Sequence, residues 1–151
     1  MSSPLHCGVE PVDLTESLDE ECLEELADFC CFALEQEALQ GAWEIALVFT
    51  SGAHLTELHS EFMDILEPTD IMTFPSDDVP GGDIIISVEQ AERQRHDDDW
   101  SLAAELRFLV AHGVLHLAGW DDSTTEDRTS MLERQHAIVA AYQSSVPSSN
   151  R

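Results

Sequence analysis

The segment WEIALVF, residues 43–49, alternates large apolar residues with smaller or polar ones. In a β-strand successive side chains point to opposite faces, so this alternation places the large residues on one face. They are Trp43, Ile45, Leu47 and Phe49. The segment is therefore predicted to be a strand with one well-buried face.

Two further segments, TDIMTF at 69–74 and DIIISV at 83–88, are rich in β-branched and aromatic residues and are also predicted to be strands. The loop between them is too short for the crossover that a parallel pair needs, which favours antiparallel pairing. The patterns thus predict a small mixed sheet. Residues 1–16 are polar and are predicted to be irregular, although residues 9–14 could supply one short edge strand.

Apolar residues recur at steps of three or four in five other segments, which predicts five helices. The predicted helices are 17–40, capped at Ser17 and closed by Gly41; 55–65, ended by Pro68; 89–96; 101–117, capped by Ser101 and stopped by Gly119; and 125–142. Residues 17–142 are therefore expected to form one domain, and residues 143–151 a flexible tail.

The 151-residue chain carries 31 acidic residues against six arginines and no lysine, which gives a net charge of −25. A field of this sign repels the phosphates of nucleic acids, so composition makes no case for nucleic-acid binding. Most of the acidic residues are expected to form a solvated surface that keeps the protein soluble. The charge also fits an acidic, salt-adapted cytoplasm, a need for divalent counterions, or docking through a protein partner.

No apolar run approaches the roughly 18–20 residues that a membrane span needs, and residues 1–21 lack the basic start and apolar stretch of a secretory signal. A cytoplasmic protein with no membrane partner is expected. Its four cysteines, Cys7, Cys22, Cys30 and Cys31, lack the C-x-x-C spacing of a zinc site. They are expected to be reduced thiols, with Cys30 as a small apolar core residue.

The segment HGVLHLAGWDD places two histidines four residues apart on a predicted helix. His112 and His116 lie about 40° apart in helical projection, so both imidazoles can reach one metal ion. A catalytic zinc site needs a third protein ligand and an open position for water. Gly119 can turn the chain back so that Asp121 or Asp122 meets the two histidines. Alternatively, the two aspartates cap the next helix or lie in solvent.

The same segment resembles the H-G-x-L-H-L-x-G-x-D-H signature of the YbeY family, metal-dependent endoribonucleases that act in rRNA maturation. PTDIMTFP, residues 68–75, resembles the family's P-T-D-V-L-S-F-P, and GGDIIISVEQA, residues 81–91, resembles its L-G-D-I-x-I-S-x-E-x-A. TSMLERQHAIV is similar to the closing helix with its M-x-x-x-E, except that Gln135 stands at the glutamate. The motifs occur in the same order and spacing, and the resemblance covers residues 43–139.

This resemblance implies a single-domain α+β fold with a small mixed sheet of about four strands, five to six helices and the metal-bearing helix packed on the sheet. It implies that His112, His116 and Asp122 are the catalytic metal ligands, with Asp122 in place of the family's third histidine. Asp121 is then expected beside the site or at a helix cap, or as a substitute ligand. Two imidazoles favour one Zn²⁺, and the carboxylate makes Mn²⁺ or Mg²⁺ more acceptable.

The activity implied by the resemblance is that of a single-strand-directed endoribonuclease, which hydrolyses phosphodiester bonds with a metal-activated water. Its roles would be small-subunit rRNA processing and ribosome quality control. The implied partners are an rRNA precursor and, in addition, ribosomal small-subunit proteins or an assembly GTPase. DNA is not an expected partner.

Two positions before the P-T-D motif depart from the family pattern, because His59 and Met63 stand where the family has an asparagine and an arginine. A guanidinium suits phosphate because it offers a permanent charge and paired donors, which methionine lacks. Either another arginine takes over this role, namely Arg93, Arg95 or Arg107, or the activity is weaker, or the role of this protein is more structural. The candidate substrate contacts are His59, Thr69, Asp70, Thr73 and Arg107.

Two other functions compete with the nuclease. A zinc metallopeptidase would carry H-E-x-x-H, in which glutamate is the general base, but position 113 is glycine. Peptide hydrolysis is therefore disfavoured. A non-catalytic ribosome-assembly factor with a structural metal site is favoured by the low basicity of the chain and by Met63.

Overall fold

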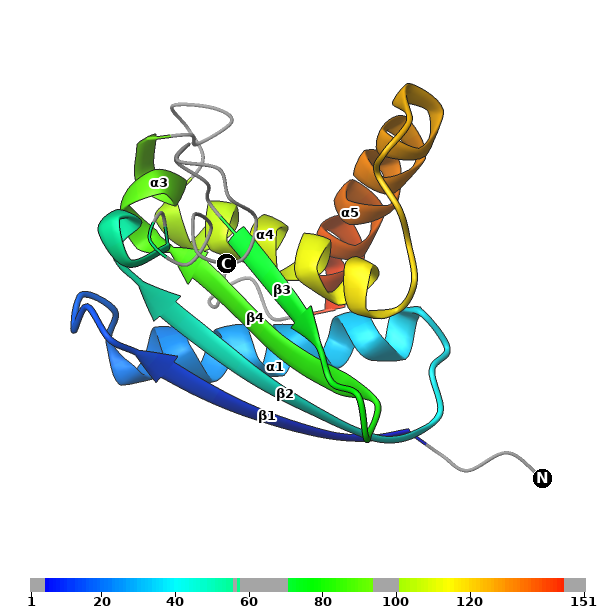
Figure 1. Ribbon diagram of the computed structural model, residues 1–151, viewed down its shortest axis with the longest axis horizontal. Helices are drawn as coiled ribbons and strands as arrows, with labels where there is room; N and C mark the ends of the chain where they lie inside the picture. The colour runs from blue at the N-terminus through cyan, green and yellow to red at the C-terminus, as the bar shows by residue number, and fades with distance from the viewer. Residues whose placement is uncertain (1–4, 56, 58–70, 94–100, 146–151) are drawn as a thin grey trace.

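A four-stranded sheet with helices against one face forms the framework of the protein (Figure 1). The computed structural model describes residues 5–55, 57, 71–93 and 101–145. The strands are β1 (Leu5–Asp13), β2 (Gly41–Thr50), β3 (Ile71–Pro75) and β4 (Gly81–Ser87). The helices are α1 (Glu20–Gln36), α3 (Val88–Arg93), α4 (Leu102–Leu117) and α5 (Thr125–Ser145). This arrangement confirms the predicted α+β fold with a small mixed sheet.

The strand order is β1-β2-β4-β3, with β1, β2 and β4 parallel and β3 antiparallel to β4. The short-loop prediction of an antiparallel β3–β4 pair is therefore confirmed. The edge strand expected near residues 9–14 is also present, but it begins at Leu5, so residues 5–13 are not irregular. Its polar character follows from its place at the edge, where one face of the strand packs on α1 and the other carries exposed side chains.

The first helix begins later than predicted, because Asp19 rather than Ser17 caps it. α1 begins three residues after Ser17, because the Asp19 side chain accepts a hydrogen bond from the Cys22 amide at 2.7 Å. The Leu18 amide donates to the Asp13 side chain at the end of β1, which holds the turn that precedes the helix.

The other predicted helices differ in extent or lie partly outside the described residues. α5 runs three residues beyond 142, into the predicted tail. Most of the predicted 55–65 helix and the end of the 89–96 helix lie outside the described residues.

The helix that carries His112 and His116, α4, packs on β3 and β4 of the sheet, as predicted, and it is flanked by α1 and α5 (Figure 1). Residues 104–115 of α4 are all buried except His112. Gly113 permits the close approach to the sheet, because a Cβ there would lie 2.8 Å from the Ile84 side chain. Within the described ranges, no helix has both the length and the apolarity that crossing a membrane requires.

Candidate metal centre

Three potential metal ligands converge where α4 ends. The Nε2 atoms of His112 and His116 are 3.0 Å apart, with the two rings nearly perpendicular at 80°. Asp122 Oδ2 lies 3.8 Å from the His112 Nε2 atom and 3.4 Å from the His116 Nε2 atom. The predicted set of two imidazoles and one carboxylate is thus assembled within a single helix and the loop after it.

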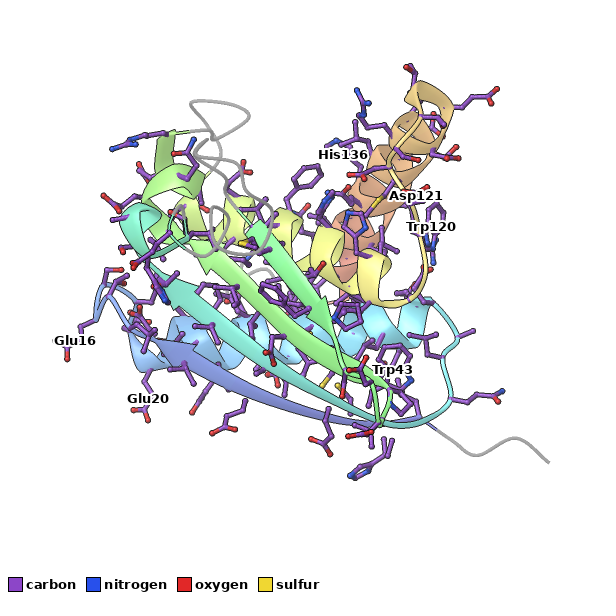
Figure 2. The ribbon with its side chains drawn as sticks, in the orientation of Figure 1. Glu16, Glu20, Trp43, Trp120, Asp121 and His136 are labelled. Carbon is purple, nitrogen blue, oxygen red and sulfur yellow. The ribbon has the colours of Figure 1, made fainter. Side chains whose placement is uncertain are left out.

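The end of α4 turns the chain so that Asp122 returns to the histidines. Gly119 has a φ of +107°, and its amide donates to the His116 carbonyl. The Trp120 amide donates to the Leu115 carbonyl at 2.9 Å, so the two bonds form a Schellman motif, which favours glycine at this position. Figure 2 shows the next residues, Trp120 and Asp121, on the loop between α4 and α5. The glycine turn predicted from the sequence is therefore what brings the carboxylate back.

Hydrogen bonds hold both imidazoles with their Nε2 atoms toward Asp122. His116 Nδ1 lies 3.2 Å from the Trp120 carbonyl oxygen, which can only accept, so Nδ1 carries the proton. His112 Nδ1 lies 3.1 Å from Gln135 Oε1, while the Gln135 amide nitrogen donates to the Phe108 carbonyl. In the neutral rings the two Nε2 lone pairs then face each other across 3.0 Å. Such a pair is repulsive unless a cation lies between them.

The donor set fits a divalent transition-metal ion. Zinc binds imidazole nitrogen and carboxylate oxygen at about 2.0–2.2 Å, so tetrahedral ligands lie about 3.3 Å apart. The three measured separations of 3.0, 3.4 and 3.8 Å are close to that value. The side chains of His112, His116 and Asp122 are 23%, 25% and 39% exposed, so one side of the cluster is open to solvent. The cluster therefore combines three donors with an accessible face.

A polar network fixes the loop that carries Asp122. The Trp120 indole donates to Glu37 Oε1 at 2.8 Å, and Arg134 on α5 donates to Glu37 Oε2 at 2.6 Å. Arg134 also donates to the Gln36 carbonyl at the end of α1. The Glu37 side chain is only 9% exposed. The loop is consequently tied to both α1 and α5, and the Trp120 carbonyl is held where His116 needs an acceptor.

Asp121 does not join the cluster. Its carboxylate accepts hydrogen bonds from the Ser123 hydroxyl at 2.7 Å and the Ser123 amide at 3.2 Å. These bonds, the one from the hydroxyl first, lower the pKa of Asp121. The cap of α5 is Thr124, whose hydroxyl accepts from the Asp127 amide. Asp121 is thus a turn residue beside the cluster, and Asp122 is the carboxylate that lies next to the two histidines.

The candidate substrate contacts fall in different places. Thr73 on β3 is paired with Ile84 on β4, so its side chain lies on the sheet face that α4 covers. Arg107 is buried and paired with Glu25 on α1, so it does not reach the histidine cluster. His59, Thr69 and Asp70 lie outside the described residues. Substrate contact by these residues stays a prediction.

Of the residues that support the cluster, some could be predicted from the sequence and others could not. Gln135 is 1% exposed and occupies the position that departs from the family's M-x-x-x-E, so the resemblance marked it. Glu37 and Arg134 carried no signal, because they are 97 positions apart and their pairing depends on how α1 and α5 pack. A polar residue near a helix end has too many surface roles to be singled out from sequence.

Gln135 offers a direct test of imidazole positioning. Gln135→Met is expected to weaken zinc affinity by about 10–100-fold, because His112 Nδ1 loses the acceptor that fixes its ring. Gln135→Glu keeps an acceptor at the same place and should not weaken binding. Titration calorimetry on metal-stripped protein measures both affinities, and urea unfolding shows that each variant is folded. Equal affinities for the two variants would contradict this role of Gln135.

Comparisons with known proteins agree with the sequence motifs. The family model described as Endoribonuclease YbeY matches residues 11–143. The chain is 31% identical over 148 residues to Endoribonuclease YbeY of Bacillus subtilis (strain 168), with 89% of this chain and 94% of that protein covered. It is 28% identical over 148 residues to Endoribonuclease YbeY of Bacillus cereus (strain B4264), with 89% and 95% covered. It is also similar to the solution structure of a Thermotoga maritima protein, with a TM-score of 0.64, 25% identity, and 90% and 89% of the two chains covered.

Proposed function

This chain belongs to the YbeY family, and we propose that it is a metal-dependent endoribonuclease that cleaves single-stranded RNA in small-subunit rRNA maturation and ribosome quality control. The observation that carries the proposal is the convergence of His112, His116 and Asp122 on one solvent-accessible point. The family resemblance supplies the substrate class, and the cluster supplies a place for the chemistry. Zinc is the proposed ion, because two imidazoles in a compact site suit it well.

The chain's own residues hold and orient the site. The Nε2 atoms of His112 and His116 and the Asp122 carboxylate would hold the ion. A bound divalent cation supplies Lewis acidity, which stabilises charge on a phosphoryl oxygen and lowers the pKa of water. Gln135 and the Trp120 carbonyl orient the imidazoles, and the buried flanks of α4 exclude water from all but the open side.

With an ion bound, the net positive charge at the cluster would favour phosphate binding, although the net negative charge of the whole chain opposes it. A divalent ion with two neutral imidazoles and one carboxylate gives a local net charge of +1, because +2 and −1 add. The chain as a whole carries −25, which opposes the approach of RNA. We therefore propose a cytoplasmic setting in which a ribosomal small-subunit protein or an assembly GTPase delivers the rRNA precursor. The Met63 position, which bears on phosphate contact, lies outside the described residues.

The second candidate is a non-catalytic assembly factor in which the metal stabilises the fold. The strongly acidic composition favours it, because weak RNA affinity suits a factor held by a protein partner. A metallopeptidase is less well supported. Its general base would have to stand at position 113, where any side chain would meet Ile84.

Removal of the metal tests the nuclease proposal. Protein purified without added ions is expected to contain about one zinc per chain by elemental analysis. Chelation should abolish multiple-turnover cleavage of a labelled single-stranded RNA, and added Zn²⁺ should restore it, because the ion supplies the Lewis acidity. A duplex of the same sequence serves as the control and should be cleaved more slowly. Full cleavage by metal-free protein would contradict the proposal. Tight binding of an rRNA precursor by the metal-loaded protein without cleavage would favour the assembly factor.

A further inference from the structure

Two cysteines meet between the edge strand and the first helix. Cys7 is on β1, where it pairs in register with Trp43, so its side chain faces the helical layer. Cys31 is on α1, which packs along β1 (Figure 1). Their Sγ atoms are 2.6 Å apart, and both residues are partly exposed. A disulfide has an S–S distance of about 2.05 Å, so little movement separates this contact from a covalent bond.

We propose that Cys7 and Cys31 form a redox-active dithiol, which a small neutral peroxide converts into a disulfide that fastens β1 to α1. The other two cysteines are placed differently. Cys30 is fully buried in the core, where an oxidant cannot reach it, and Cys22 lies more than two helical turns from Cys31 on α1. The four reduced thiols expected from the sequence would then describe the reduced state of the protein, and the Cys7–Cys31 disulfide would describe its oxidised state.

The oxidation proceeds in two balanced steps. The Cys31 thiolate attacks one peroxide oxygen, the O–O bond breaks, and Cys31 becomes a sulfenic acid while the second oxygen leaves and is protonated to water. The Cys7 sulfur then attacks the Cys31 sulfur, so that the S–S bond forms, the S–O bond breaks and a second water leaves. Two thiols lose two electrons in total, and the peroxide gains them.

The environment of the pair assigns the order of attack. The hydrogen bond between the two thiols lowers the pKa of Cys31. The same hydrogen bond, followed by burial, raises the pKa of Cys7. Cys31 is therefore the sulfur that attacks first, since the thiolate is the nucleophile. Cys7 is the sulfur that resolves the sulfenic acid.

The charge of the protein selects the oxidant. Asp28 and Glu35 lie close enough to Cys31 to oppose its ionisation, and the whole chain carries −25. Such a field repels anionic oxidised glutathione but has no net effect on neutral hydrogen peroxide. Raising the ionic strength is therefore expected to speed disulfide formation by oxidised glutathione by about ten-fold and to change the rate with hydrogen peroxide by less than about two-fold, because salt screens the field. The same salt dependence for both oxidants would overturn this part of the proposal.

Oxidation of the full chain with hydrogen peroxide tests the pair. The expected result is a mass loss of two hydrogens, a Cys7–Cys31 linked peptide in a non-reducing digest, and two thiols still free. The melting temperature should rise by about 5–10 °C and return with dithiothreitol, because the link closes a loop between β1 and α1. Cys22→Ser is the matched control and should still form the link, whereas Cys31→Ser should not. Four free thiols after oxidation of the unmodified chain, or links through Cys22 or between molecules, would overturn the proposal.

Discussion

His116→Ala is expected to abolish RNA cleavage and to lower metal affinity by more than about 100-fold, a larger loss than removal of a supporting hydrogen bond causes. The physical reason is that His116 supplies one of two imidazoles and lies nearer to Asp122 than His112 does, at 3.4 Å. Its loss also leaves the Trp120 carbonyl without the hydrogen bond from His116 Nδ1. Metal binding and cleavage should therefore disappear together, as measured by calorimetry on stripped protein and by a multiple-turnover RNA assay.

A second histidine provides the control for this substitution. His6 on β1 is exposed and lies on the strand at the far edge of the sheet from β3, so His6→Ala should leave both measurements unchanged. The two variants remove the same chemical group from different places. Cleavage by His116→Ala at the unmodified rate would contradict the metal mechanism. Retained metal binding with lost cleavage would instead show that another set of ligands holds the ion.

Local patterns predicted the parts of this protein that lie in single elements. The strand at residues 43–49 followed from strict alternation, and the cap of α4 at Ser101 followed from a serine ahead of an apolar helix. The convergence of Asp122 with the two histidines could also be predicted from the sequence. It depends on one glycine and four intervening residues, so the geometry is set by a single helix end.

Features that depend on two distant elements were less predictable. Asp19 caps α1 rather than Ser17, because Asp13 at the end of β1 holds the intervening turn. The bond from Trp120 to Glu37 spans 83 positions and forms only when α1 and the α4–α5 loop are packed together. A residue pattern with a period of two or 3.6 has no information about such pairs. For this reason the sequence pointed to the three residues that converge after α4, but not to the network that holds their loop.

Two substitutions of Asp122 are expected to separate charge from geometry. Asp122→Asn keeps the shape of the side chain but removes its negative charge, so zinc affinity should fall by more than about 100-fold and cleavage should fall with it. Asp122→His supplies a third imidazole. It should restore zinc binding while weakening Mn²⁺ binding, because nitrogen is a softer donor than carboxylate oxygen. Calorimetry with Zn²⁺ and Mn²⁺ on metal-stripped protein measures both effects.

A substitution of the neighbouring Asp121 is the control that shows whether the effect belongs to the Asp122 carboxylate alone. Asp121→Asn removes the same charge one residue earlier, where the side chain is exposed and bonded to Ser123 rather than directed at the histidines. Its effect on zinc affinity should be less than about ten-fold, because it changes only the surrounding field. If Asp122→Asn bound zinc as the unmodified chain does and Asp121→Asn did not, the ligand would be Asp121. If neither changed the affinity, the ion would lie elsewhere, since a carboxylate that touches a divalent cation cannot lose its charge without effect.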